Sequence, residues 1–192
     1  MTADVSHRKR ALRVELRERR RQLSVRDRAA ATDALTRRLI DLATQLRVSS
    51  LSAYLPMPDE PDVWPFVEWA NQQGIRVLVP VSRNDGLLDW TVEKGRGQTE
   101  GIFGLPEPIG EVLGPIAIND VDLIIVPAAC VDRTGMRMGW GRGYFDRTLG
   151  SMDRCPPVYA VVFDNEVLDY VPSEVHDKRI DGVVTPSATV RF

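Results

Sequence analysis

Apolar residues recur every three or four positions near the N-terminus, and this spacing predicts two amphipathic helices. In residues 7–23, Leu12, Leu16 and Leu23 lie on one stripe, and strong helix formers fill the positions between them. Ser24 is a typical N-cap residue and predicts the start of a second helix, which ends near Arg47. The apolar positions of this second helix are Leu35, Leu39, Leu42 and Leu46.

Short apolar runs replace the helical pattern after residue 47 and predict strands. The expected strands span 48–55, 75–81, 87–92, 121–132 and 158–163, with one more short strand in the tail at 171–186. Helical patterns lie between them at 61–74 and 144–150. The glycines and prolines of residues 93–119 predict a long loop.

Strands that alternate with helices predict an α/β fold. We expect a three-layer open sheet, mostly parallel, with helices on both faces and an N-terminal helical pair. We expect the 192 residues to form a single domain, on which residues 1–47 pack.

Composition and charge exclude several classes of protein. Hydrophobic residues make up 43 % and charged residues 27 % of the chain, and the net charge is −2, so no overall field attracts nucleic acid or membrane. Cys130 and Cys155 have no metal-ligand spacing and fit a reducing compartment. No apolar run is long enough to span a bilayer, and the basic N-terminus lacks the apolar region of a signal peptide. We therefore expect a cytoplasmic protein with no membrane partner.

The segment "GMRMGWGRGYFDRTL", residues 135–149, is the first candidate for chemistry. Gly139, Gly141 and Gly143 form a G-x-G-x-G pattern that lets backbone N–H groups approach an anion, and Arg137 and Arg142 can contact phosphate. The segment follows a predicted central strand, where open α/β sheets bind ligands. Its spacing matches neither the P-loop nor the dinucleotide fingerprint. The residues alone fit either a polyphosphate site or a glycine-rich turn with exposed arginines.

Two further features allow more than one interpretation. Asp146 can hold Mg²⁺ against phosphates, or it can be an ordinary aspartate of a first helical turn. Lys9, Arg13 and Arg17 form one basic stripe at helical spacing, which suits phosphate binding, a solvated face or a nucleic-acid contact.

Five pieces of sequence together carry a resemblance to a known family. In order, they are "KRALR", "YLPMPDE", "FGLPEP", "VPAACVDRTGMRMGWGRGYFDR" and "PSEVHDKRIDGVVTP". From about Arg8 to Pro186, the chain resembles the 5-formyltetrahydrofolate cyclo-ligase family, also called 5,10-methenyltetrahydrofolate synthetase. The resemblance implies an ATP- and Mg²⁺-dependent conversion of 5-formyltetrahydrofolate to 5,10-methenyltetrahydrofolate that releases ADP and phosphate. It also implies that ATP phosphorylates the formyl oxygen, after which N10 attacks the carbon and phosphate leaves.

The resemblance also implies roles for individual residues. The ATP-binding residues would be Lys9, Arg13, Arg137, Met138, Gly139, Trp140, Gly141, Arg142, Gly143, Tyr144 and Phe145. The substrate-binding residues would be Leu55, Glu60, Trp140, Gly141, Arg142, Gly143 and Tyr144, of which Arg142 and Tyr144 would be catalytic. Asp146 and Asp181 would be the aspartates associated with magnesium. Phe145 stands where the family frequently has tyrosine, so a hydroxyl is absent there.

Several further expectations concern exposure and partners. We expect Lys9 and Arg13 to be exposed, and Arg8, Arg19, Arg20 and Arg21 to form a solvated basic face. We expect Cys130 to be a buried strand-end residue, and Trp64, Trp69 and Trp90 to belong to the core or to a pocket wall. The chemistry that the resemblance implies needs neither His7 nor His176 as a base. The expected partners are ATP and 5-formyltetrahydrofolate, which can carry a polyglutamate tail, with no nucleic acid, and the chain is expected to be a monomer.

Two alternatives remain open from the sequence. The first is another ATP-dependent ligase or kinase on the same fold with a changed substrate. The second, more distant, is an RNA-binding module that uses the basic N-terminal helix.

Overall fold

A mostly parallel sheet forms the centre of the molecule. The computed structural model describes residues 2–95, 98–100, 106–152, 154–174 and 177–192. Within these ranges, seven strands form one sheet in the order β12-β11-β9-β6-β1-β2-β3. Their bounds are Ser50–Ser52 (β1), Arg76–Ser82 (β2), Leu88–Val92 (β3), Leu123–Pro127 (β6), Val158–Val161 (β9), Gly182–Val184 (β11) and Thr189–Arg191 (β12). The neighbours from β11 to β2 are parallel, and β3 and β12 are antiparallel edge strands.

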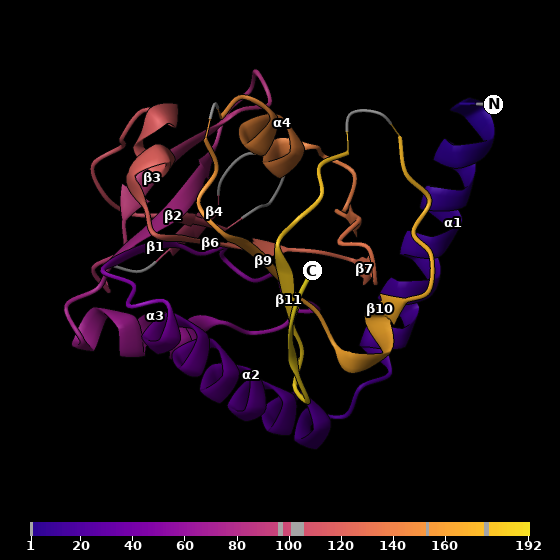
Figure 1. Ribbon diagram of the computed structural model, residues 1–192, viewed down its shortest axis with the longest axis horizontal. Helices are drawn as coiled ribbons and strands as arrows, with labels where there is room; N and C mark the ends of the chain where they lie inside the picture. Colours follow the sequence, from indigo (N-terminus) through magenta and orange to yellow (C-terminus); the bar gives the residue numbers. More distant parts are fainter. Residues whose placement is uncertain (1, 96–97, 101–105, 153, 175–176) are drawn as a thin grey trace.

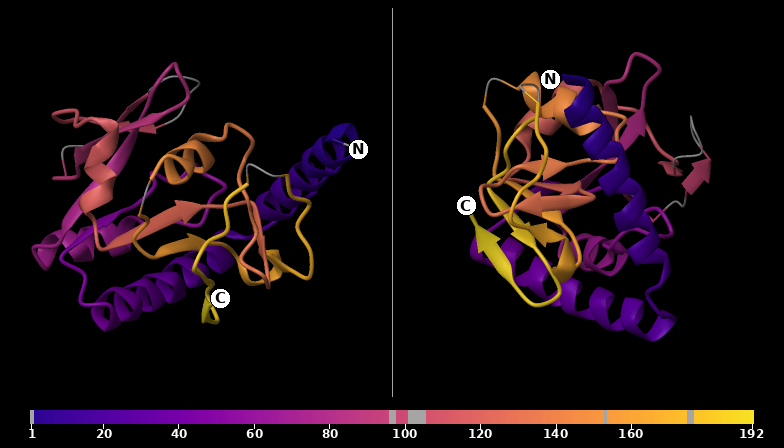
Figure 2. Two further views of the ribbon diagram at one scale, coloured as in Figure 1. Left: turned by 45° about the horizontal axis from the view of Figure 1, so that its top comes forward. Right: turned by 90° about the vertical axis from the view of Figure 1, so that its right-hand side faces the viewer.

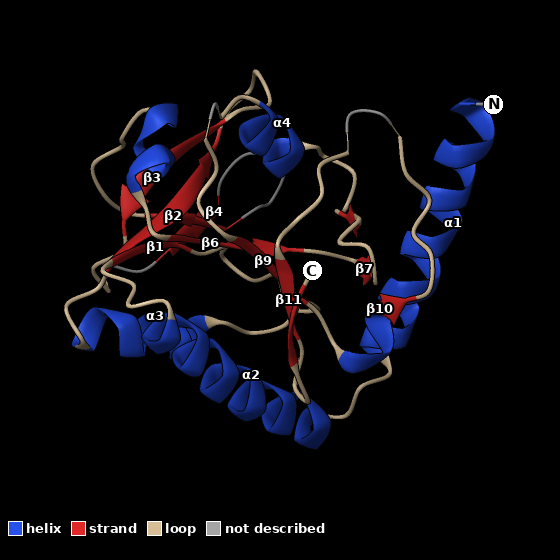
Figure 3. Ribbon diagram, in the orientation of Figure 1, coloured by secondary structure: helices blue, strands red, loops and turns tan. Residues whose placement is uncertain are grey.

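Helices cover both faces of this sheet, which confirms the predicted three-layer α/β fold (Figures 1 and 3). The helices α2 (Val25–Gln45) and α3 (Trp64–Gln72) bury their apolar stripes on one face. The helix α4 (Tyr144–Gly150) and the 3₁₀ helix η2 (Pro115–Asp120) pack on the other. The predicted cap is also confirmed, because the Ser24 hydroxyl accepts a hydrogen bond from the backbone N–H of Asp27 at the start of α2.

The first helix, α1 (Thr2–Arg21), does not pack alongside α2 as a helical hairpin. Figures 1 and 2 show it diverging from α2 along one side of the molecule. There it packs on a small sheet of β10 (Val167–Leu168), β7 (Cys130–Asp132) and β8 (Arg137–Met138). The contact is made by Leu16, which is buried with Cys130 and Met138. The two N-terminal helices therefore cover different parts of the fold.

The apolar run at 121–132, which the sequence predicts as one strand, contains two. β6 ends at Pro127 and belongs to the large sheet, whereas β7 begins at Cys130 and belongs to the small sheet. Proline has no backbone N–H to continue the ladder, so the chain can leave the large sheet at this point. The hydrophobic pattern did not show the change because both strands are buried.

Three other segments differ from the sequence-based expectation. The first strand is only Ser50–Ser52, shorter than the predicted 48–55. The predicted loop 93–119 contains the paired strands β4 (Gln98–Glu100) and β5 (Pro106–Pro108) as well as η2, while residues 101–105 lie outside the described ranges. The tail supplies two strands of the large sheet, β11 and β12, where one was expected, and β10 follows the short 3₁₀ helix η3 (Asp164–Glu166). No helix in the described part of the chain is both long and apolar enough to cross a membrane.

Candidate active site

Two neighbouring cavities meet at the glycine segment, which we define as residues 139–146. The larger cavity has a volume of about 780 Å³ and the smaller one about 420 Å³. Both are lined by Gly139, Arg142, Gly143 and Asp146, so the glycine segment is a wall that the two cavities share. This arrangement suits a reaction in which a group passes between two bound molecules.

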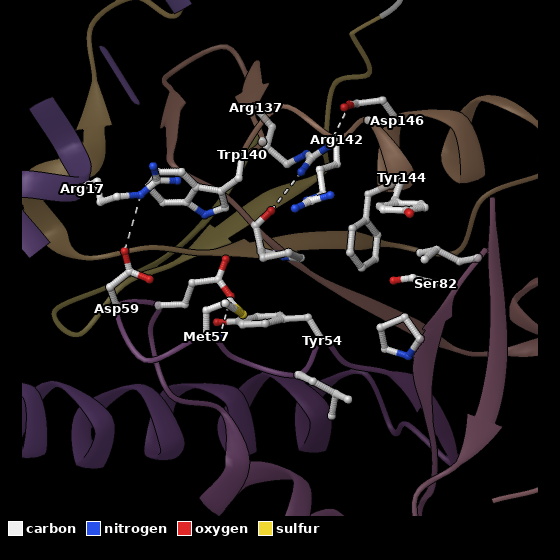
Figure 4. A pocket seen from close by; sticks show the side chains of 18 of the residues that line it. Arg17, Tyr54, Met57, Asp59, Ser82, Arg137, Trp140, Arg142, Tyr144 and Asp146 are labelled. Atoms are coloured by element: carbon white, nitrogen blue, oxygen red, sulfur yellow. Dashed lines mark hydrogen bonds and ion pairs between the residues drawn. The ribbon is translucent and has the colours of Figure 1, made fainter. Parts of the chain in front are cut away.

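The larger cavity lies at the carboxyl ends of the parallel strands, the usual ligand position in an open α/β sheet. Ser82 ends β2, Pro127 ends β6, and the loop after β1 contributes the floor. In the view of Figure 4, Arg142 and Trp140 lie on the upper side of the cavity, and Tyr54 and Met57, from the loop after β1, lie on its lower side. The two residues that were expected to contact only the folate, Leu55 and Glu60, both line this cavity and not the smaller one.

The smaller cavity is closed by α1 and the C-terminal tail. Lys9 and Arg13 line it from α1, and Glu174 and Asp177 line it from the tail. The two basic residues that were expected to contact ATP phosphates thus lie together on this side of the glycine segment. Their neighbours in the wall are Met138, Gly141 and Arg147, in addition to the four residues shared with the larger cavity.

The backbone of the glycine segment explains two of its glycines. Gly141 has a φ of +100° and Gly143 a φ of +71°, conformations that side chains rarely adopt. A Cβ at Gly141 would also lie 3.4 Å from Cζ of Arg13. Arg13 is half-buried against this backbone and donates from Nε to the Gly139 carbonyl oxygen at 2.8 Å. The helix α1 is therefore docked directly on the glycine segment.

Arg137 is buried and paired, so it positions a neighbour as well as lining the larger cavity. Its side chain is only 3 % exposed. Nη2 donates to Oδ1 of Asp146 at 2.7 Å, and Nη1 donates to the Pro127 carbonyl oxygen at 2.9 Å. This fork fixes the Asp146 carboxylate at the wall between the cavities. A direct contact of Arg137 with ATP stays a prediction.

Lys9 is not exposed, and that expectation was wrong. The residue is 5 % exposed, and Nζ lies 2.9 Å from Oε2 of Glu174 and 2.5 Å from Oδ2 of Asp177. Burial lowers the pKa of Lys9, but the hydrogen bonds and charges of these two carboxylates outweigh it, and the net pKa is raised. Lys9 is a charged group in the wall of the smaller cavity.

The structure separates the two aspartates that were expected to hold magnesium. Asp146 lies at the cavity wall, but the Asp181 carboxylate accepts a hydrogen bond of 2.8 Å from the Val158 N–H, at the amino end of β9. Arg137 holds Asp146 beside Pro127, at the carboxyl end of β6. Asp146 and Asp181 therefore lie at opposite ends of the parallel strands. The structure therefore does not bring Asp181 into a site with Asp146.

Asp177 and Glu174 were missed by the sequence reasoning, although they line the smaller cavity with Asp146. Their only signal was their place in the segment "SEVHDKR". This loop has no periodicity, so the sequence does not indicate which of its carboxylates turns inward. Carboxylate oxygens suit Mg²⁺, so the donor chemistry of these three residues fits that ion. Across the described residues, no ready-made cluster of metal ligands occurs, and Lys9 pairs with both tail carboxylates, offsetting one of their two negative charges.

Glu60 has an unusual environment in the larger cavity. Its Oε2 accepts a hydrogen bond of 2.9 Å from the Met57 N–H in the loop after β1. Burial raises the pKa of Glu60 to about 7, against the opposing effects of this N–H and of the Arg20 charge. At neutral pH this carboxyl can therefore both accept and release a proton.

The aromatic residues of the glycine segment serve mainly as walls. The Tyr144 hydroxyl donates to the Arg83 carbonyl oxygen at 3.1 Å, so it is already engaged at the end of β2. Phe145 packs against the core on both faces of the sheet and lines the larger cavity, a role that needs no hydroxyl. The Trp140 ring lies near two guanidinium groups, those of Arg17 and Arg20.

The expectation that Arg20 belongs to a solvated basic face was wrong, because Arg20 is among the most deeply buried side chains of the protein. The structure agrees with other expectations: Cys130 is buried at the start of β7, where burial raises its thiol pKa to about 12, and Trp90 is fully buried. His176 lies outside the described residues.

Comparison with known proteins identifies relatives over nearly the whole chain. A model of the 5-formyltetrahydrofolate cyclo-ligase family matches residues 5–186. The chain is 37 % identical to a 5-formyltetrahydrofolate cyclo-ligase of Mycolicibacterium smegmatis, over 91 % of this chain and 92 % of that protein. It is 25 % identical to the protein of the same name in Escherichia coli, over 90 % and 97 %.

Two solved structures are similar in fold. The Aquifex aeolicus 5,10-methenyltetrahydrofolate synthetase matches with a TM-score of 0.80 and 25 % identity, covering 95 % of this chain and 92 % of that one. The 5,10-methenyltetrahydrofolate synthetase of Mycoplasma pneumoniae matches with a TM-score of 0.73 and 20 % identity, covering 92 % and 97 %.

Proposed function

The chain belongs to the 5-formyltetrahydrofolate cyclo-ligase family, and from this premise we propose that it converts 5-formyltetrahydrofolate to 5,10-methenyltetrahydrofolate at the expense of ATP. The observation that carries the proposal is the pair of cavities on either side of the glycine segment. A phosphoryl transfer needs two substrates held in contact, and a shared wall of small residues permits this.

We assign the ATP phosphates to the smaller cavity and the folate to the larger one. Arg13 and Arg142 supply positive charge to the smaller cavity, together with the backbone of the glycine segment. Lys9 lies in the same wall, where it is paired with Glu174 and Asp177. The larger cavity has walls of Tyr54, Leu55 and Trp140 that suit a flat ring system, and Glu60 is a polar group within it. Arg142 lines both cavities, which supports its assignment to the charge that develops during transfer.

The proposed reaction has two steps. The formyl oxygen attacks the γ-phosphorus of ATP, and the bond to the ADP oxygen breaks, which leaves an imidate phosphate on N5. N10 then attacks the formyl carbon, the carbon–oxygen bond breaks, and phosphate departs with that oxygen. N10 loses its proton as the ring closes, and the Glu60 carboxylate, with a pKa of about 7, is suited to accept it.

We propose that Mg²⁺ accompanies the nucleotide in the smaller cavity, where it would neutralise phosphate charge. The candidate oxygen ligands are those of Asp146, Asp177 and Glu174, which replace the earlier pair of Asp146 and Asp181. Arg137 supports this assignment because it holds the Asp146 carboxylate in a fixed position.

The two alternative functions have less support. A ligase or kinase with another substrate is less favoured, because the two residues that the resemblance links to the folate alone, Leu55 and Glu60, line one cavity together. An RNA-binding helix would need a free basic face, whereas Lys9 and Arg20 are engaged within the protein.

We further propose a monomeric, cytoplasmic enzyme whose 192 residues act as one unit. The smaller cavity supports the single unit, because it joins residues from Ser6 to Asp177.

The proposal is tested by near-ultraviolet absorbance, because methenyltetrahydrofolate absorbs there and 5-formyltetrahydrofolate does not. The purified protein is mixed with 5-formyltetrahydrofolate and Mg²⁺, with and without ATP. We expect the methenyl band to grow only with ATP. A folded protein that produces no band under these conditions contradicts the proposed function.

A further inference from the structure

We propose that Arg20 is a positioning residue of the larger cavity, where its guanidinium group fixes the indole of Trp140 as a wall for the bound folate. The identity of the ligand rests on the function proposed above. Arg20 itself does not line this cavity, so its effect on the ligand passes through Trp140.

The guanidinium group of Arg20 is held rigidly. The residue is 1 % exposed, and Nε and Nη2 donate to the two carboxylate oxygens of Glu166 at 2.6 and 2.8 Å. Nη2 also donates to the Ala128 carbonyl oxygen at 2.8 Å. A fork–fork pair of this kind sets both the position and the plane of the guanidinium group.

This fixed cation lies over the aromatic ring of Trp140. The Arg20 Cζ is 4.8 Å from the centre of the Trp140 ring and 5.5 Å from that of Phe163. Arg17 approaches the same indole, with its Cζ 5.1 Å from the ring centre. Arg17 is much more exposed, and its ion pair with Asp59 is long, at 3.8 Å (Figure 4). The anchored contact is therefore the one from Arg20, since cation–π attraction is strongest away from water.

The backbone restrains Trp140 weakly, so its side-chain contacts decide how the indole is oriented. The indole packs against the cluster of Leu16, Cys130 and Met138, and it makes a polar contact with Glu60 that lowers the pKa of that carboxyl. The neighbours of Trp140 on both sides are Gly139 and Gly141, and glycine restrains the backbone least of all residues. Without the guanidinium group, the indole would lose the most rigidly held of its charged contacts.

The effect of Arg20 should be specific to the folate side. Arg13, which holds the smaller cavity's wall, is seven residues earlier on α1, a separation of about 10 Å along a helix. Several charged or titratable groups surround Glu60: Arg20 from α1, Asp59 and Asp62 in its own loop, Arg28 from α2, and Tyr54 after β1. The Arg20 charge favours the carboxylate form of Glu60, so its loss would reinforce the effect on the larger cavity.

The test compares ligand affinities of two variants with the wild-type protein. Arg20→Lys keeps the charge but loses the planar fork, and the double variant Arg20→Met with Glu166→Gln avoids leaving a buried carboxylate unpaired. Arg10→Lys and Arg10→Met are the matched controls, because Arg10 is an exposed arginine on the same helix. Calorimetric titrations measure the Kd of 5-formyltetrahydrofolate without ATP, and the Kd of a non-hydrolysable ATP analogue with Mg²⁺.

We expect the double variant to raise the folate Kd by about tenfold and to change the nucleotide Kd by less than about twofold. Arg20→Lys should lie between the wild type and the double variant, and the Arg10 variants should match the wild type. In a Trp140→Ala background, the Arg20 substitutions should have a much smaller effect on the folate Kd, since most of the effect passes through the indole and only the charge effect on Glu60 is left.

Two results would overturn the inference alone: folded variants that bind the folate as tightly as the wild type does, or equal weakening of both ligands. An undiminished effect of Arg20 in the Trp140→Ala background would overturn it as well. A wild-type protein that binds no 5-formyltetrahydrofolate would instead contradict the proposed function, and the inference with it.

Discussion

Lys9 near the start of the chain and Asp177 near its end form an ion pair, with Nζ 2.5 Å from Oδ2 across 168 residues of sequence. The pair attaches α1 to the tail and closes one side of the smaller cavity. A residue at the proposed nucleotide site is thereby also part of what holds the fold together.

The first prediction concerns this pair. Lys9→Ala should lower the free energy of unfolding by about 2 to 3 kcal/mol, because it leaves two carboxylates without their buried partner. It should also raise the KM for ATP. Urea unfolding and initial rates measure the two effects. Arg8→Ala is the control, since its ion pair with Asp4 is exposed and should contribute less than about 0.5 kcal/mol. A Lys9→Ala protein as stable as the wild type would contradict the buried pair.

The second prediction separates the candidate metal ligands. Asp146→Asn should raise the Mg²⁺ concentration that gives half-maximal activity by about tenfold or more, because it removes a charged ligand at the cavity wall. Asp181→Asn should leave this concentration unchanged, because its side chain can still accept the Val158 N–H bond. Titration of activity with Mg²⁺ provides the measurement. A larger effect at Asp181 than at Asp146 would support Asp181 as a magnesium ligand and contradict the site of Asp146, Asp177 and Glu174.

The third prediction concerns Gly141. Alanine at this position is strained by about 1 kcal/mol or more at a φ of +100°, and its Cβ would contact the Arg13 side chain, with Cζ 3.4 Å away. The KM for ATP should therefore rise by about tenfold. Gly74→Ala is the matched control, because Gly74 also has a positive φ of +75° but has open space around its Cβ. Both variants should lose stability, and a similar rise in KM in both would show that strain alone is responsible.

The fourth prediction is a pH dependence set by Glu60. The pKa of Glu60 is raised from 4.5 to about 7 by burial, so between these values the folded protein holds a proton that the unfolded chain has lost. The stability from this group is present at low pH and is lost as the pH rises through about 7. The rate kcat/KM should rise over the same range, because the carboxylate accepts the N10 proton.

Glu60→Gln tests this assignment with two readouts. The variant should lose the rise in kcat/KM near neutral pH. It should also become more stable relative to the wild type as the pH increases, since glutamine does not titrate. Urea unfolding at pH values on either side of the transition measures the second effect. If the wild type and the variant have parallel pH profiles of stability, Glu60 does not carry the raised pKa.

The comparison of sequence and structure shows which features local patterns can predict. The leucines of α2 and the buried run of β6 follow from periodicity, because one helical stripe or one apolar run decides each of them. The burial of Lys9 and Arg20 depends on Glu174, Asp177 and Glu166, which are remote in sequence. A basic stripe looks the same whether its partner is water or a distant carboxylate.

The site shows the same division. Gly139–Asp146 lines both cavities, and the sequence could single this segment out because its glycines and its resemblance to a family are local features; the ligands stay a prediction. The separation of Asp181 from Asp146 could not be predicted, because it depends on which end of the sheet each carboxylate occupies, which is a fact of topology. The restraint on Trp140 also depends on a contact that the sequence does not reveal.

The central claim is that a phosphoryl group passes from ATP to the formyl oxygen across the glycine segment, and one isotope measurement tests it most directly. 5-Formyltetrahydrofolate that carries heavy oxygen in its formyl group is converted by the enzyme with unlabelled ATP, and the released phosphate is examined by mass spectrometry. The account predicts that each phosphate released contains the heavy oxygen, in equal amount to the methenyltetrahydrofolate formed. Unlabelled phosphate would mean that ATP is hydrolysed by water and would contradict the transfer.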